Sequence, residues 1–324
     1  MSLDRPLRLA LRARELLSIY AELGKARLSL LVVVTAAVGF VMAGATGGPL
    51  DWVKLVLVCG GVMLAAGSAN ALNQLWEAGR DARMARTKTR PLPAGRIGAG
   101  HAAAAAAVGG AAGIAMLAMG VNVAAGWLAA INILLYVLVY TPLKPRTTLN
   151  TLVGAIVGAI PPVIGWVGAT GSFGLGAWVL GGVLFAWQMP HFLALAWLYR
   201  DQYAAGGFRM LPAADPTGRL TCTTILMYCT ALVPVTMLTT GVGMTGWVYF
   251  AGAVVLNGWL ILGAARMARE LNDANARRLF IASVIYLPLL MGLMVVDRRT
   301  PTADGVGATS AAPTPAEIAR DLGD

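Results

Sequence analysis

The sequence predicts an all-α polytopic membrane protein, a bundle of nine transmembrane helices. Of its 324 residues, 58% are hydrophobic and only 12% are charged, about half the share found in ordinary soluble domains. Nine apolar runs are each long enough to cross the hydrocarbon core of a bilayer as a helix. Lys and Arg gather in the loops of one side. This pattern excludes a soluble globular enzyme, a disordered chain and a secreted disulfide scaffold.

The chain begins with a polar segment, residues 1–27, which we expect on the cytoplasmic side. Arginines interrupt each of its apolar stretches, so it does not resemble a cleavable signal peptide. Its leucines and arginines are typical of a short helix that lies on the membrane surface.

The nine spans form one domain over residues 28–296, and a tail follows. The tail, 297–324, is rich in Ala, Thr, Pro and Asp and is predicted to be disordered. In chain order, the apolar runs cover residues 28–45, 53–76, 102–119, 122–140, 149–168, 176–198, 222–242, 247–265 and 279–296.

The distribution of basic residues predicts the orientation. All but four of the 25 Lys and Arg residues fall in the N-terminal segment or in loops after even-numbered spans. Basic loops stay in the cytoplasm. We therefore expect a cytoplasmic N-terminus, an external C-terminus and, in a bacterium, the inner membrane. The net charge of +10 then reflects these loops, and no nucleic-acid partner is predicted.

The fifth span contains two adjacent prolines and two glycines at a spacing typical of helix contacts. Pro161 and Pro162 cannot donate backbone hydrogen bonds, so they are predicted to break the hydrogen-bond ladder of this helix, a break that membrane helices tolerate. Gly154 and Gly158 are four residues apart, a spacing that allows close approach of a neighbouring helix.

Two long cytoplasmic loops, roughly 77–101 and 199–221, indicate where function resides. Near the first, Asn73, Glu77 and Asp81 are spaced i, i+4, i+8 and would share one helix face. Oxygen-bearing side chains suit Mg²⁺, which proteins hold through one or two carboxylates together with substrate phosphates.

Arg86 and Arg90 follow four residues apart, and guanidinium groups match phosphate oxygens in two-point geometry. Acidic residues for a metal followed by basic residues for phosphate predict a diphosphate site. The alternative is a helix end with solvated charges and an ordinary basic loop.

Three motif blocks in order carry a resemblance to a known family. They read Asn73-Gln-x-x-Glu77-x-x-x-Asp81-x-x-Met84-x-Arg86-Thr87-x-x-Arg90-Pro91-Leu92, then Tyr140-Thr-Pro-Leu-Lys144 with Gly154 to Trp166, then Trp187-Gln-Met-Pro-His191 with Asp201-x-Tyr203. The first block resembles the UbiA superfamily of intramembrane prenyltransferases. The other two resemble its haem-modifying branch, over about residues 20–296. Pro145 separates Lys144 from Arg146, whereas the family more often has Lys-Arg directly.

The resemblance implies nine helices around a central cavity, with an isoprenoid diphosphate bound through Mg²⁺ at the cytoplasmic mouth. It implies that farnesyl diphosphate is joined to a vinyl group of haem B with addition of water, which gives haem O and diphosphate. Haem B is then a substrate, Mg²⁺ the cofactor and a haem A synthase a candidate partner.

The resemblance also implies roles for individual residues. The catalytic candidates are Asn73, Glu77, Asp81, Lys144, Asp201 and His191, of which the first three would hold the metal. The diphosphate candidates are Arg86, Arg90, Lys144, Arg146 and Tyr203. The haem or cavity candidates are His191, Tyr140, Trp166 and Trp187. His191 is interpreted as an iron ligand or as a donor to a propionate or diphosphate, with a structural histidine as the alternative. Packing is the alternative for the three aromatic residues.

Two other functions stay open. One is a prenyltransferase of the same superfamily that acts on a quinone or aromatic precursor, which the third block and its single aspartate disfavour. The other is a transporter, which should carry ionisable residues near the bilayer midplane. Here the charged residues fall at span ends or in loops.

Overall fold

The computed structural model describes residues 5–44 and 50–299, and over these ranges the chain is almost entirely helical. Nine helical segments are long and apolar enough to cross a membrane, so the predicted class and the nine spans are confirmed for the described residues. Most of the predicted disordered tail, from residue 300 on, lies outside them. The elements are α1 (Arg5–Leu23), α2 (Ala26–Ala43), α3 (Trp52–Asp81), α4 (Ala99–Gly120), α5 (Val123–Leu134), the π-helix η2 (Leu135–Tyr140), α6 (Thr141–Leu143), α7 (Asn150–Thr170), α8 (Leu175–Leu198), α9 (Arg200–Ala205), α10 (Leu211–Ala214), α11 (Arg219–Gly241), α12 (Trp247–Arg269) and α13 (Asp273–Val296).

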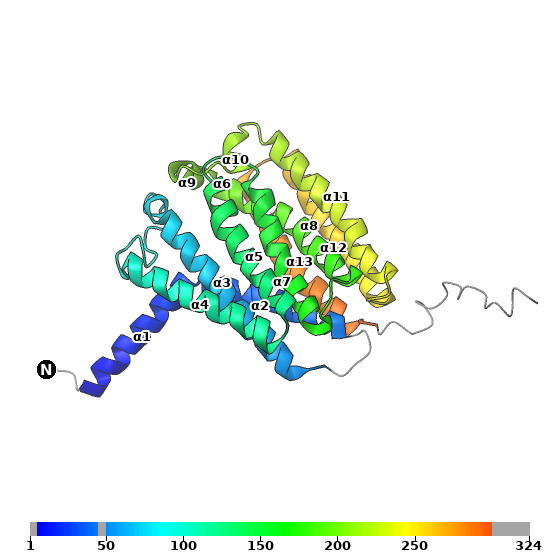
Figure 1. Ribbon diagram of the computed structural model, residues 1–324. Coiled ribbons are helices and arrows are strands. Elements are labelled where there is room, and N and C mark those ends of the chain that lie inside the picture. The colour runs from blue at the N-terminus through cyan, green and yellow to red at the C-terminus, as the bar shows by residue number, and fades with distance from the viewer. Residues whose placement is uncertain (1–4, 45–49, 300–324) are drawn as a thin grey trace, which may run out of the picture.

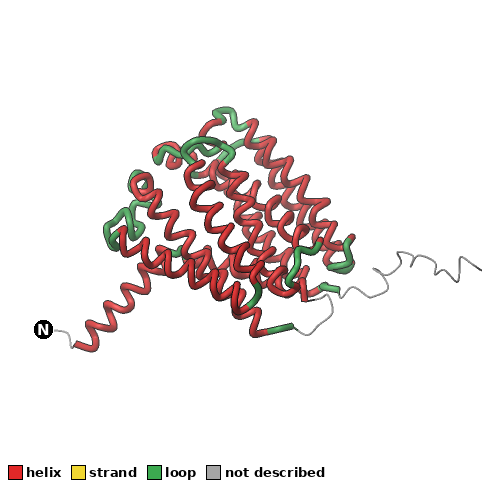
Figure 2. Tube along the Cα trace, viewed as in Figure 1, coloured by secondary structure: helices red, strands yellow, loops and turns green. Residues whose placement is uncertain are grey.

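The long helices lie side by side in one bundle, from which α1 projects at an angle (Figure 1). The short helices α6, α9 and α10 gather at one end of the bundle, where the longer loops also lie (Figure 2). Backbone hydrogen bonds join these loops, since Arg209 N donates to Lys144 O at 2.7 Å. Arg86 N of the loop after α3 donates to Gln202 Oε1 at 3.3 Å, so the two long loops that the sequence indicates meet at this end.

Helix α3 is longer than predicted. The apolar run ends near residue 76, yet the helix continues for a further turn and a half to Asp81. The loop expected from residue 77 thus begins at residue 82. This extension holds Glu77 and Asp81 on ordered backbone in register with Asn73, which is the face that the spacing predicts.

Pro161 and Pro162 lie within the fifth span without ending its helix. Helix α7 runs without interruption from Asn150 to Thr170 with both prolines inside it. Membrane helices tolerate such prolines because neighbouring groups and local adjustments satisfy the carbonyls that lose their partners.

Two glycines let α2 and α7 approach until their backbones touch. A Cβ atom on Gly165 would lie 1.9 Å from Ala36 O, and one on Gly39 would lie 2.1 Å from Pro162 O. No larger residue fits at either position without displacing backbone. The close contact fixes the rotation of α7, and with it the side chains that α7 presents to the interior.

Candidate functional site

A cavity of about 350 Å³ opens among α2, α3, α5, η2, α7 and α8. Its outer part is polar and lies at the end of the bundle that carries the short helices. Its inner wall is apolar and includes Val62, Ile133 and Ile164. Eight of the predicted site residues line it: Asn73, Glu77, Asp81, Arg86, Arg90, Tyr140, Lys144 and Tyr203.

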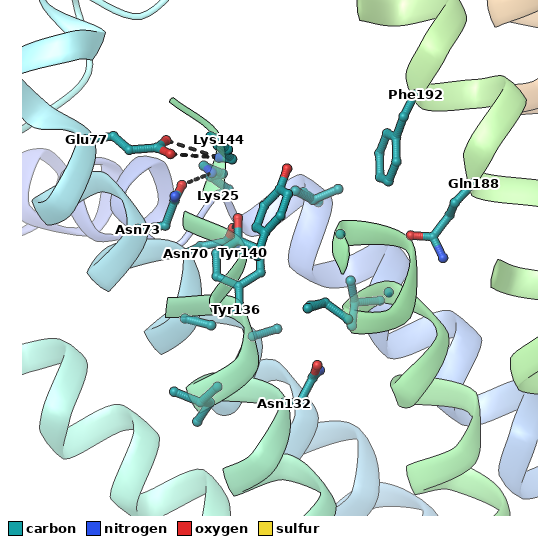
Figure 3. A pocket seen from close by; sticks show the side chains of 18 of the residues that line it. Lys25, Asn70, Asn73, Glu77, Asn132, Tyr136, Tyr140, Lys144, Gln188 and Phe192 are labelled. Atoms are coloured by element: carbon teal, nitrogen blue, oxygen red, sulfur yellow. Dashed lines mark hydrogen bonds and ion pairs between the residues drawn. The ribbon is translucent and has the colours of Figure 1, made fainter. Parts of the chain in front are cut away.

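The predicted oxygen face of α3 is present, and it is buried. Asn73, Glu77 and Asp81 are only 0%, 4% and 1% exposed. Each oxygen-bearing group is paired with one cation, and two of these pairs are drawn in Figure 3. The pairs are Lys25 Nζ with Asn73 Oδ1 at 3.1 Å, Lys144 Nζ with Glu77 Oε1 at 2.9 Å, and Arg90 Nη1 with Asp81 Oδ2 at 2.6 Å.

Surrounding groups orient this face. Asn73 Nδ2 donates to Thr141 Oγ1 at 3.1 Å, and that hydroxyl donates in turn to Tyr136 O at 2.8 Å. The Asn73 amide oxygen is therefore turned toward Lys25. The Lys144 ammonium lies 4.5 Å from the centre of the Tyr140 ring, a favourable cation–π arrangement.

The chemistry of the donor set fits Mg²⁺. Asp81 Oδ1 is buried and has no hydrogen-bond partner among the described residues, so one carboxylate oxygen is available to a cation. Over the same residues, no cluster of three or more His, Cys, Asp or Glu side chains forms a full protein cage. Two carboxylates and an amide oxygen match the usual Mg²⁺ site, in which substrate phosphates and water complete the coordination.

Lys25 also lines the cavity, although its position in the sequence indicates only a basic residue of the N-terminal segment. Lys25 precedes α2 in a left-handed conformation with φ of 47°, which costs a residue with a side chain about 1 kcal/mol. Burial, together with the charges of Arg90 and Lys144, lowers the pKa of Lys25 to about 7. An anion placed among these three cations would relieve their repulsion.

Trp187 and His191, from the third motif block, face away from the cavity. His191 Nδ1 lies 2.9 Å from Ser283 Oγ, and the imidazole stacks between Trp187 and Phe280, each 4.9 Å away between ring centres. Trp187 Nε1 donates to Ser283 O at 2.9 Å. Both side chains thus pack between α8 and α13. Neighbouring helix positions point about 100° apart, so Gln188, the residue after Trp187, points in a different direction. Neither His191 nor Trp187 lines the cavity.

Three other predicted residues also lie outside the cavity. Trp166 is near the far end of α7 and packs on Gly176, where a Cβ atom would lie 2.1 Å from the indole ring. Asp201 is exposed on the short helix α9. Arg146 is exposed in the loop before α7. Gln188 and Phe192 of α8 line the cavity instead, although neither was among the predicted site residues.

The fold and the site define an intramembrane enzyme, and comparison with known proteins agrees. Residues 32–290 match the UbiA prenyltransferase family. The chain belongs to this family.

Named relatives support a particular branch. The chain is 40% identical over 279 residues to the mitochondrial protoheme IX farnesyltransferase of Arabidopsis thaliana, and the match covers 86% of this chain and 64% of that protein's length. It is also 40% identical to the protoheme IX farnesyltransferase of Solibacter usitatus, over 86% of this chain and 98% of the relative. Among solved structures, a UbiA homologue from Archaeoglobus fulgidus bound to GPP and Mg²⁺ shares the fold, with a TM-score of 0.60 and 14% identity over 85% of this chain and 99% of that one.

Proposed function

We propose that this chain joins farnesyl diphosphate to a vinyl group of haem B, with addition of water, and releases haem O and diphosphate. The observation that carries the proposal is the cavity. Its outer part combines a buried face suited to a metal with several cationic side chains, and its inner part is apolar. The names of the 40% identical relatives support haem B as the acceptor. A quinone or aromatic acceptor is the alternative.

The residues at the mouth match the first chemical step. When bound, Mg²⁺ would be held by Asn73, Glu77 and Asp81 and would neutralise charge on the leaving diphosphate. Lys25, Arg90 and Lys144 now contact the same three side chains. With a metal diphosphate in place, these cations would turn to the phosphate oxygens and stabilise the charge that develops as the allylic bond breaks.

The interior matches the second step. An allylic cation has to be kept from bulk water until the vinyl carbon attacks it. The apolar wall of the cavity excludes water, and the rings of Tyr136, Tyr140 and Phe192 line the same space. Aromatic faces stabilise a nearby cation.

We place the active site on the cytoplasmic side of the bacterial inner membrane, with the N-terminus inside and the C-terminus outside. The asymmetry of Lys and Arg supports this orientation. A haem A synthase, which would consume the product, is the proposed partner.

The decisive experiment supplies the purified protein with haem B, farnesyl diphosphate and Mg²⁺, and identifies the product by mass. We expect haem O, and we expect none when the metal is chelated. A parallel reaction replaces haem B with an aromatic acid. Prenylation of that acid without prenylation of haem B would establish the alternative function.

Arg86→Ala and Arg90→Ala are expected to weaken the binding of farnesyl diphosphate by about 1.5–3 kcal/mol each, the worth of a charge-assisted hydrogen bond, and to affect haem B less. Both guanidinium groups line the cavity mouth. Calorimetric titration with each substrate measures the effect. Arg146→Ala is the matched control because Arg146 is exposed outside the cavity. Equal losses for both substrates would contradict a phosphate role.

His191→Phe is expected to leave the Soret band of the haem-loaded protein unchanged. The substitution preserves the ring stack with Trp187 and Phe280 but removes the hydrogen bond to Ser283, so thermal unfolding should reveal a loss of about 1 kcal/mol. Absorption spectra of wild type and variant test the first expectation. A shifted Soret band in the variant would contradict this expectation and would support His191 as an iron ligand.

A further inference from the structure

Gln188 is a polar side chain on an otherwise apolar part of the cavity wall. It is 5% exposed, and its amide nitrogen donates to Ala155 O at 3.3 Å and to Leu184 O at 3.0 Å. Both partners are carbonyl oxygens, which can only accept, so the orientation of the amide is determined. The oxygen Oε1 is left facing the cavity (Figure 3), with no hydrogen-bond partner among the described residues.

Two glycines of α7 show how deep this oxygen lies. A Cβ atom on Gly154 would lie 2.8 Å from the Tyr140 ring, and one on Gly158 would lie 2.0 Å from Gln188 Oε1. The GxxxG spacing that predicted a helix contact therefore makes room for two cavity side chains. Because these glycines are four residues apart, Gln188 lies about one helical turn, roughly 6 Å, further in than Tyr140. Tyr140 in turn contacts Lys144, one of the cations proposed to bind the diphosphate.

We propose that Gln188 Oε1 holds the water molecule that becomes the hydroxyl group of the product. This inference rests on the proposed function. Farnesyl C1 bonds to the outer vinyl carbon of haem B as the C1–O bond breaks, and the bonding pair leaves with diphosphate. The vinyl π electrons form the new bond, which leaves a cation on the inner vinyl carbon beside the pyrrole. The water oxygen then bonds to that carbon.

The chemistry of the amide suits this task. A water that donates one hydrogen to Oε1 keeps a lone pair free to attack the cation. The amide oxygen is too weakly basic to keep the proton, which passes to the released diphosphate, so that atoms and charge balance. Without a held water, the same cation loses a proton from the adjacent carbon and gives an alkene that is lighter by one water.

The test is the ratio of alkene to alcohol in the haem product, measured by mass for Gln188→Met. We expect this ratio to rise by about 10-fold or more, which corresponds to the loss of one hydrogen bond to the attacking water. The ratio does not depend on the folded fraction, because unfolded protein makes neither product. Gly158→Ala, which pushes the amide oxygen aside without removing it, should shift the ratio in the same direction.

Gln74→Met is the matched control. Gln74 is also buried, and its amide nitrogen also donates to two backbone carbonyls, Glu22 O and Leu23 O. It does not line the cavity, so the product ratio should stay that of the wild type. Asn132→Leu removes the other unpaired cavity amide, which lies about two helical turns further in than Tyr140. Its ratio should also stay unchanged.

Three results would overturn the proposal. The first is an unchanged ratio in Gln188→Met and Gly158→Ala. The second is loss of both products from a folded Gln188→Met protein, which would place Gln188 before the carbon–carbon bond forms. The third is a shift in Asn132→Leu alone. If wild-type protein makes no prenylated haem, the proposed function fails instead, and the two failures are distinguishable.

Discussion

Asp81→Ala is expected to lower prenyl transfer by about 100- to 1,000-fold, the usual effect of removing one preorganised charge-stabilising group from an active site, while the protein stays folded in the membrane. Asp81 is 1% exposed, and its only described ion pair is with Arg90. The substitution removes a proposed metal ligand and little packing. Initial rates of haem product formation across a Mg²⁺ titration measure the effect.

Glu77→Ala should behave in the same way, because Glu77 lies on the same face of α3 and contacts Lys144. Asp273→Ala is the control, since that carboxylate is exposed and pairs with Arg200 outside the cavity. Near-normal haem O production by Asp81→Ala and Glu77→Ala at limiting Mg²⁺ would contradict the metal-site hypothesis.

Gly165→Ala is expected to destabilise the bundle by about 3 kcal/mol, toward the upper end of the usual cost of overpacking. The added methyl group would lie 1.9 Å from Ala36 O and 2.8 Å from Phe40 N. Both atoms belong to the backbone of α2, so the two helices have to separate. Thermal unfolding in detergent, followed by helical circular dichroism, measures the change in stability.

Gly109→Ala provides the matched control within α4. A Cβ atom at Gly109 meets nothing within 4 Å, so alanine should be neutral or should stabilise the helix by up to about 1 kcal/mol. Equal unfolding temperatures for the two variants would contradict the close contact between α2 and α7.

The class of protein, the nine spans and the spacing of the oxygen-bearing face of α3 follow from the sequence alone. These features are local. A run of apolar residues crosses a bilayer wherever it stands in a chain, and Asn73, Glu77 and Asp81 share one face of any helix that contains them. The length of α3 had to be corrected, since its last turn and a half is polar and lies beyond the apolar run.

Which side chains reach the cavity depends on tertiary contacts between the helices. The third motif of the sequence contains Trp187, Gln188 and His191 side by side, and periodicity does not say which of them points inward. The rotation of each helix about its axis is set by contacts with other helices, such as the backbone contact at Gly165. That rotation turns Gln188 to the cavity and His191 to Ser283. Lys25 reaches Asn73 through a left-handed turn, a conformation that no local pattern in the sequence specifies.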